Sequence, residues 1–185
     1  MSGPVMKLRV SPTDIASASS VEPPRGARTE ASRSFAVLGS AILDQMCRRG
    51  RLAVHSRRAL PYVLATARGR IAVSVMVSTV AGGTANKHML VPVSSLATPP
   101  MATGHVIVCA FIGKRERDRA SGNGVAVRLI GWVTAEEARR YVGAESRVNT
   151  RLSVAAVPVS ALRPMQALRH YLAPEGASND KEEQK

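Results

Sequence analysis

The sequence predicts an α+β (mixed α/β) domain with a central mixed sheet of about five strands flanked by helices. Apolar side chains recur at helical spacing in residues 34–50, and short apolar runs with strand patterning follow between residues 52 and 132. A helix start signal then precedes one more strand and a last helix. The resulting order of helix, several strands, helix, strand and helix is typical of an α+β fold.

The first predicted element is an amphipathic helix over residues 34–50. Its apolar positions follow a 3-4-4 spacing: Phe35, Leu38, Ile42 and Met46. Ser34 can cap the start, and Gly50 can close the end. Arg48 and Arg49 stand near that end, where positive charge suits the helix dipole.

Strands are predicted next. The first is residues 52–55, and residues 61–66 and 71–79 then form a hairpin whose turn contains Gly69. Residues 89–93 form a short edge strand, because Pro92 cannot donate to a ladder. Residues 105–112 are almost continuously apolar, which is typical of a central strand. Residues 124–132 return as its antiparallel partner.

The last predicted elements follow clear end signals. Thr134 and Glu137 form a capping box that starts a short helix reaching Tyr141. Residues 152–159 are extended. Pro164 fits the first turn of a final helix over residues 165–172.

Three segments are expected along the 185 residues. Residues 1–32 are rich in Ser, Pro, Ala and Arg and predict a disordered basic arm. Residues 33–172 form the α/β domain, and residues 173–185 a flexible polar tail. No apolar run is long enough to cross a membrane and no secretion signal is evident, so we expect a cytoplasmic protein.

The chain is strongly basic, with 26 Lys and Arg against 13 Asp and Glu and a net charge of +13. A field of this sign attracts polyanions and favours salt-sensitive contacts with phosphate. The partner predicted from charge is therefore DNA or RNA, bound without sequence specificity. The alternative is that the charge serves only solubility.

The layout of these elements resembles the PD-(D/E)XK nuclease-like superfamily over about 130 residues. The resemblance rests on the helix ending at Arg49-Gly50, the hairpin, the strand over residues 105–112, the junction from Leu129 to Glu137 and the closing segment from Val157 to Met165. It implies a restriction-endonuclease-like fold. In that superfamily an Asp, a Glu or Gln and a Lys act with a divalent cation to hydrolyse nucleic acid.

The catalytic residues of that superfamily are missing from the matching positions of this chain. The Asp position is Val63, the acid position is Ser74 and the Lys position is Met76. An aliphatic group, a hydroxyl and a thioether are poor ligands for Mg²⁺. We therefore expect no enzyme activity, no catalytic residue, no metal and no cofactor.

Clustered arginines are the candidate nucleic-acid-binding residues: Arg48, Arg49, Arg51, Arg57, Arg58, Arg68 and Arg70. The expected function is a non-catalytic nuclease-fold protein that binds nucleic acid, or belongs to a nucleoprotein or viral assembly, through this basic surface. If the chain is phage-encoded, it belongs in a virion.

Two further functions remain open. One is a purely structural or protein-binding subunit with protein assembly partners, for example a phage virion component. The other is a metal-dependent nuclease with relocated ligands, such as Asp44 with Glu136 or Glu137. Cys47 and Cys109 lie in apolar stretches and are expected to be core residues.

Overall fold

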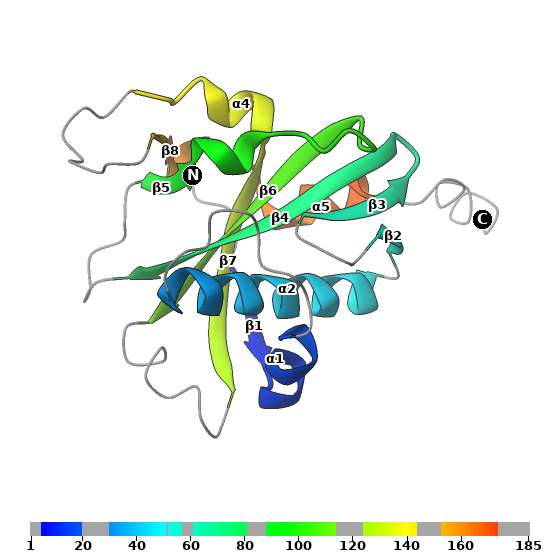
Figure 1. Cartoon of the computed structure of the whole chain (residues 1–185), viewed down its shortest axis with the longest axis vertical. Helices are drawn as coiled ribbons and strands as arrows, with labels where there is room; N and C mark the ends of the chain where they lie inside the picture. The colour runs from blue at the N-terminus through cyan, green and yellow to red at the C-terminus, as the bar shows by residue number, and fades with distance from the viewer. Residues whose placement is uncertain are drawn as a thin grey trace, which may run out of the picture.

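The computed structural model describes residues 5–19, 30–50, 52–56, 61–80, 88–113, 124–143 and 153–173. At its centre lies a six-stranded mixed sheet in the order β1-β7-β6-β4-β3-β2 (Figure 1). Its strands are β1 (Met6–Val10), β2 (Ala53–Ser56), β3 (Tyr62–Thr66), β4 (Gly69–Val80), β6 (Gly104–Gly113) and β7 (Val125–Thr134). Among the described strands of this sheet, only β4 and β6 pair in parallel. The predicted class, an α+β domain with a central mixed sheet, is confirmed.

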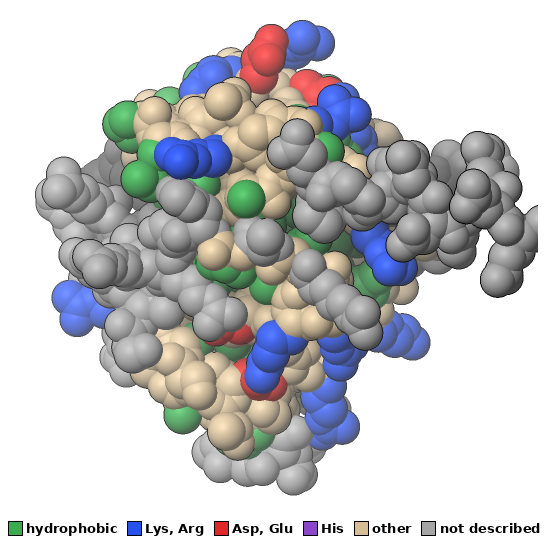
Figure 2. All heavy atoms as spheres, turned by 90° about the vertical axis from the view of Figure 1, so that its right-hand side faces the viewer, with side chains coloured by type: hydrophobic (Ala, Val, Ile, Leu, Met, Phe, Trp, Pro, Cys, Tyr) green, Lys and Arg blue, Asp and Glu red, His purple; other side chains and the backbone are tan. Residues whose placement is uncertain are grey.

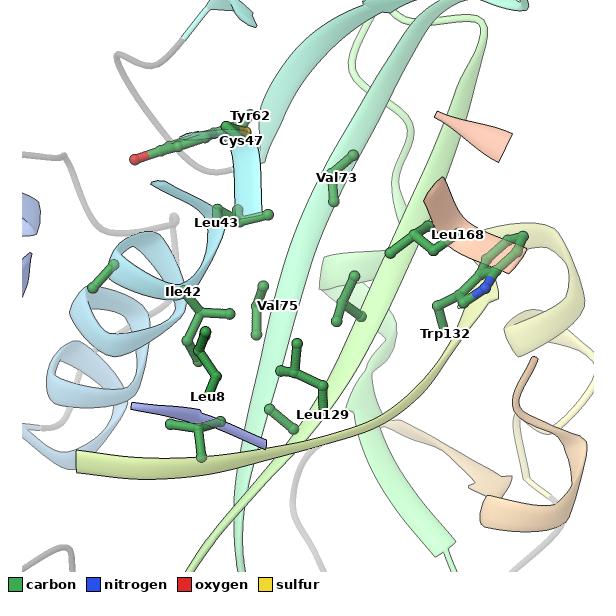
Figure 3. Packing of buried hydrophobic residues seen from close by; sticks show 14 of the residues in the cluster. Leu8, Ile42, Leu43, Cys47, Tyr62, Val73, Val75, Leu129, Trp132 and Leu168 are labelled. Atoms are coloured by element: carbon green, nitrogen blue, oxygen red, sulfur yellow. The ribbon is translucent and has the colours of Figure 1, made fainter. Parts of the chain in front are cut away.

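One face of the sheet is covered by α1 (Pro12–Ala18), α2 (Glu30–Gly50) and α5 (Met165–Tyr171). In Figure 3, Ile42 and Leu43 of α2 point towards Leu8, Val75 and Leu129 of the strands. A Cβ at Gly39 would lie 3.1 Å from the Val75 carbonyl oxygen, so glycine allows α2 to approach β4 closely. This face holds the larger apolar core.

The opposite face is covered by a separate two-stranded sheet, a 3₁₀ turn and a short helix. These are β5 (His88–Pro92), β8 (Val154–Pro158), η1 (Val93–Leu96) and α4 (Ala135–Arg139). Strand β6 alternates between the two cores, because Val106 and Val108 face the first and Ile107 and Cys109 the second. Burial on both faces explains why residues 105–112 are almost continuously apolar, as predicted for a central strand.

Local end signals are where the sequence places them. Gly69 adopts φ +93° in the turn between β3 and β4, a conformation in which glycine lacks the usual penalty. Thr134 and Glu137 form the predicted capping box of α4. Pro164 is the N-cap of α5.

The predicted disordered arm over residues 1–32 is wrong for residues 5–19 and for residues 30–32, which begin α2. Met6–Val10 forms β1 on the edge of the main sheet, and Pro12–Ala18 forms α1 with a capping box between Ser11 and Asp14. The composition of the segment indicated disorder, but residues 7–10 alternate as in a strand. Leu8 and Val10 are buried, and Lys7 and Arg9 are exposed. Residues 1–4 and 20–29 of the proposed arm lie outside the described residues, as does the proposed tail beyond residue 173.

Helix α2 begins at Glu30, four residues before the predicted cap, so Ser34 lies inside the helix.

Cys47 and Cys109 are both buried, in the cores on opposite faces of the sheet, which confirms them as core residues. In the part of the chain that the structure describes, no helix combines the length and apolar character needed to cross a membrane.

The segment over residues 129–137 contacts the closing segment over residues 157–165. The backbone of Trp132 on β7 exchanges two hydrogen bonds with Arg163, at 3.0 and 2.8 Å, and the indole Nε1 donates to the Pro164 carbonyl at 3.1 Å. A Cβ at Gly131 would lie 2.7 Å from the Arg163 carbonyl oxygen. Glycine at this position therefore permits the closing segment to dock against β7.

Candidate nucleic-acid interface

The three positions that the resemblance matched to catalytic residues, Val63, Ser74 and Met76, lie on one face of the sheet. Val63 of β3 pairs with Ala72 of β4, so the two side chains point the same way. Side chains alternate along a strand, so Ser74 and Met76 share that face with Ala72. η1, β5, β8 and α4 cover another part of this same face.

A buried hydrogen-bond pair occupies this face. The Ser74 hydroxyl lies 2.8 Å from His105 Nε2, and His105 Nδ1 lies 3.0 Å from the Ala97 carbonyl oxygen. Because burial lowers the pKa of His105 to about 4, the ring is neutral at pH 7. A carbonyl can only accept, so Nδ1 donates to Ala97 and Nε2 accepts the hydrogen bond from Ser74.

These residues do not fit the magnesium ion that a nuclease of this layout would use. Mg²⁺ prefers carboxylate, phosphate and water oxygens, whereas this face offers an aliphatic chain, a thioether and a hydroxyl that already donates to imidazole. Within the described ranges, His, Cys, Asp and Glu form no group of three that could hold a metal ion. These residues therefore do not form a site for Mg²⁺.

The acids proposed as relocated metal ligands, Asp44 with Glu136 or Glu137, belong to helices on opposite faces of the sheet. Asp44 is on α2, which packs on one face of the sheet, and Glu136 and Glu137 are on α4, which packs on the other. Burial acts to raise the pKa of Glu137, but hydrogen bonds from Thr134 and pairing with Arg163 outweigh it and hold the pKa below its usual value. Glu137 thus serves as a helix cap and ion-pair partner.

Basic side chains outnumber acidic ones among the side chains that the structure describes. Only four acids are among them: Asp14, Asp44, Glu136 and Glu137. Twelve are basic: Lys7, Arg9, Arg33, Arg48, Arg49, Arg68, Arg70, Arg128, Arg139, Arg140, Arg163 and Arg169. Since two of the four acids pair with Arg48 and Arg163, most of the basic charge is not neutralised by a described acid.

Four of the seven predicted binding residues are described, on two separate elements. Arg48 and Arg49 end α2, and Arg48 donates to Asp14 of α1 and to the Asp44 carbonyl. Arg68 and Arg70 flank the β3–β4 turn, where the Arg68 guanidinium lies 4.9 Å from the centre of the Tyr171 ring. Arg51, Arg57 and Arg58 lie outside the described side chains.

Eight of the twelve described basic side chains were not among the predicted binding residues, and three of the eight lie together. Lys7 and Arg9 on β1 and Arg128 on β7 share one face of the sheet, and we call them the β1–β7 strip. The alternation of charged and apolar residues from Lys7 to Val10 was the available signal. The Ser, Pro, Ala and Arg content of residues 1–32 instead indicated a disordered arm.

The comparisons with known proteins place this chain in no family. No protein-family model, no curated protein and no solved structure matches it. The protein is an α+β domain with a mixed sheet, and basic side chains outnumber acidic ones among its described residues.

Proposed function

We propose that this protein binds nucleic acid through contacts between its basic surface and phosphate, and that it does not hydrolyse the nucleic acid. The observation that supports this proposal best is the charge of the described surface, which has twelve basic side chains and four acidic ones. Two of the four acids form ion pairs, with Arg48 and Arg163. Such a field concentrates polyanions at the surface and releases their counterions on binding. It would act in the same way in a free protein and in a nucleoprotein or viral assembly.

The arrangement around Ser74 supports binding without catalysis. Its hydroxyl and His105 are buried and bonded to each other, and the neighbouring positions Val63 and Met76 offer no hard ligand. A neutral histidine whose pKa is about 4 is also a weak base at pH 7. No cofactor is needed for the proposed role.

Few aromatic side chains are available to stack on bases. Tyr62, Phe111 and Trp132 are buried and cannot stack at the surface, whereas Phe35, Tyr141 and Tyr171 are half-buried. Contacts with phosphate carry no sequence information. We therefore expect similar affinity for unrelated sequences of the same length.

Fluorescence anisotropy with labelled single-stranded DNA, duplex DNA and RNA tests this function at about 50 mM salt and above. The expected result is binding that weakens steeply as salt rises. The absence of binding to all three probes at the lowest salt would contradict the proposal. That result would favour the alternative of a structural or protein-binding subunit.

A nicking assay on supercoiled plasmid with Mg²⁺ or Mn²⁺ tests the non-catalytic part. We expect the plasmid to stay supercoiled. Nicking that persists in a purified Ser74→Ala variant and disappears with a chelator would show a metal-dependent nuclease with ligands elsewhere.

The described residues among the predicted seven can be tested with a double variant, Arg49→Gln with Arg70→Gln. Both side chains are exposed, and together they should lower the salt slope of binding by about 1.8, at about 0.9 for each phosphate contact. Arg48 is unsuitable for this test because its removal also breaks the ion pair with Asp14. An unchanged slope would remove these two residues from the surface.

A further inference from the structure

The β1–β7 strip is a row of basic side chains on an edge of the main sheet. Lys7 and Arg128 are direct cross-strand partners, and Arg9 stands opposite Ala126. All three basic side chains are exposed, while the intervening Leu8 and Val127 are buried on the other face. The strip is therefore fixed by two rigid, paired strands.

The spacing within the strip suits a regular row of negative charges. Neighbouring strands lie about 4.8 Å apart, and residues two apart on a strand are separated by about 6.8 Å. Lys7 and Arg9 therefore sit about 6.8 Å apart along β1, with Arg128 beside Lys7. β1 is an edge strand, so the strip borders the open side of the sheet.

Asp14 and Asp44 belong to helices on the opposite face of the sheet from the strip. Asp14 lies close to the backbone of β1, because the Gln45 amide donates both to the Arg9 carbonyl oxygen at 2.9 Å and to Asp14 Oδ2 at 2.7 Å, and its carboxylate also pairs with Arg48. Glu136 lies beyond the end of β7, and Thr134 is already about 20 Å along that strand from Arg128. In Figure 2 the acidic side chains at the top and in the lower centre lie next to basic ones, and several Lys and Arg side chains gather at the lower right.

We propose that the β1–β7 strip binds the phosphate backbone of double-stranded nucleic acid. This rests on the proposed function and adds its site and the form of its ligand. The strip carries Lys7, Arg9 and Arg128 with the small Ala126, and Phe111, the cross-strand partner of Arg128, is buried. Since none of the strip residues is aromatic, the attraction is electrostatic, and a duplex offers twice the linear charge density of a single strand.

The test is a triple variant, Lys7→Gln with Arg9→Gln and Arg128→Gln, measured by anisotropy on a duplex of about 25 base pairs over about 50 to 200 mM salt. A charge-matched control carries Arg33→Gln, Arg140→Gln and Arg169→Gln, three exposed positions on or next to other elements. Circular dichroism and urea unfolding verify that both variants are folded.

If each strip residue neutralises one phosphate, the strip variant loses about 2.7 from its salt slope. Over this fourfold range of salt the unmodified protein should then lose about 40-fold more affinity than the strip variant. The control should keep most of the slope. A single strand of the same length should bind more weakly than the duplex, with a shallower slope.

The outcomes separate the strip from the proposed function. If the unmodified protein binds with a steep salt dependence but the strip variant behaves like the control, the strip inference is wrong and nucleic-acid binding stands. Tighter binding of the single strand than of the duplex also overturns the strip inference. If the unmodified protein binds no probe, both proposals fail.

Discussion

The Ser74 hydroxyl donates a hydrogen bond to His105 Nε2 across a distance of 2.8 Å, between the two parallel strands at the centre of the sheet. His105 is held in place at its other nitrogen by the Ala97 carbonyl, 3.0 Å away. Both side chains are buried, so each supplies the partner that the other would otherwise lack. The pair therefore satisfies two buried polar side chains between β4 and β6.

Replacing Ser74 with Ala should lower the free energy of unfolding by about 1–3 kcal/mol, because His105 Nε2 would be left buried without a donor. Urea unfolding at pH 7 measures the effect. Ser78→Ala is the matched control, since Ser78 is farther along the same strand and only half-buried. Equal stability of the two variants would show that the hydrogen bond contributes nothing.

Stability should fall as the pH drops from about 6.5 towards 4. Burial lowers the pKa of His105 to about 4 in the folded chain, against 6.5 in the unfolded chain. Between these values the unfolded state binds more protons, so stability rises with pH and is lost on acidification. The full shift corresponds to about 3 kcal/mol, of which about 2 kcal/mol lies between pH 6.5 and 5.

Urea unfolding at pH 7 and pH 5 checks this dependence. A His105→Gln variant should lose most of it, whereas His170→Gln, at an exposed position on α5, should retain it. If His105→Gln keeps the full pH dependence, His105 is not its source.

Patterns that depend on near neighbours allowed much of the fold to be predicted. The turn at Gly69, the capping box at Thr134 and the central strand all follow from spacing within a few residues. Strand β1 could not be placed in this way, because it is five residues long and pairs with β7, more than 100 positions later. Its alternation from Lys7 to Val10 is visible in the sequence, but it is too short to show which strand is the partner.

Changing Gly131 to Ala should destabilise the protein by about 1–3 kcal/mol, as overpacking does. The added Cβ would lie 2.7 Å from both the Arg163 carbonyl oxygen and Leu162 Cβ, so the closing segment would have to move. Gly104→Ala is the control, since its nearest contact is the flexible end of Ile71 at 3.3 Å. Urea unfolding compares the two, and similar stability would contradict the tight docking of that segment.

The carboxyl of Asp14 should titrate well below the usual range of aspartate. Hydrogen bonds from Arg48, Gln45 and Ser11 lower its pKa, so its contribution to stability is present above pH 3.8 and is lost as the pH falls below that value. An Arg48→Gln variant should raise this pKa, measured by NMR titration of the Asp14 carboxyl carbon. Arg49→Gln should leave it unchanged, and a shift of equal size there would contradict the specific ion pair.

The candidate interface could be predicted only in part. Net charge indicated a polyanion partner, but the sequence could not show that Arg48 pairs with Asp14 or that Lys7 stands beside Arg128. Both relationships join residues distant in sequence and depend on the packing of helices and strands. The Ser74–His105 pair was missed for the same reason, although a serine between Val73 and Val75 and a histidine beginning an apolar strand were visible signals.

The most direct test of nucleic-acid binding through phosphates is the slope of log affinity against log salt for the unmodified protein on one duplex. The strip alone predicts a slope of about −2.7 or steeper, with similar values for two duplexes of unrelated sequence. A slope near zero, or no binding at about 50 mM salt, would contradict the account.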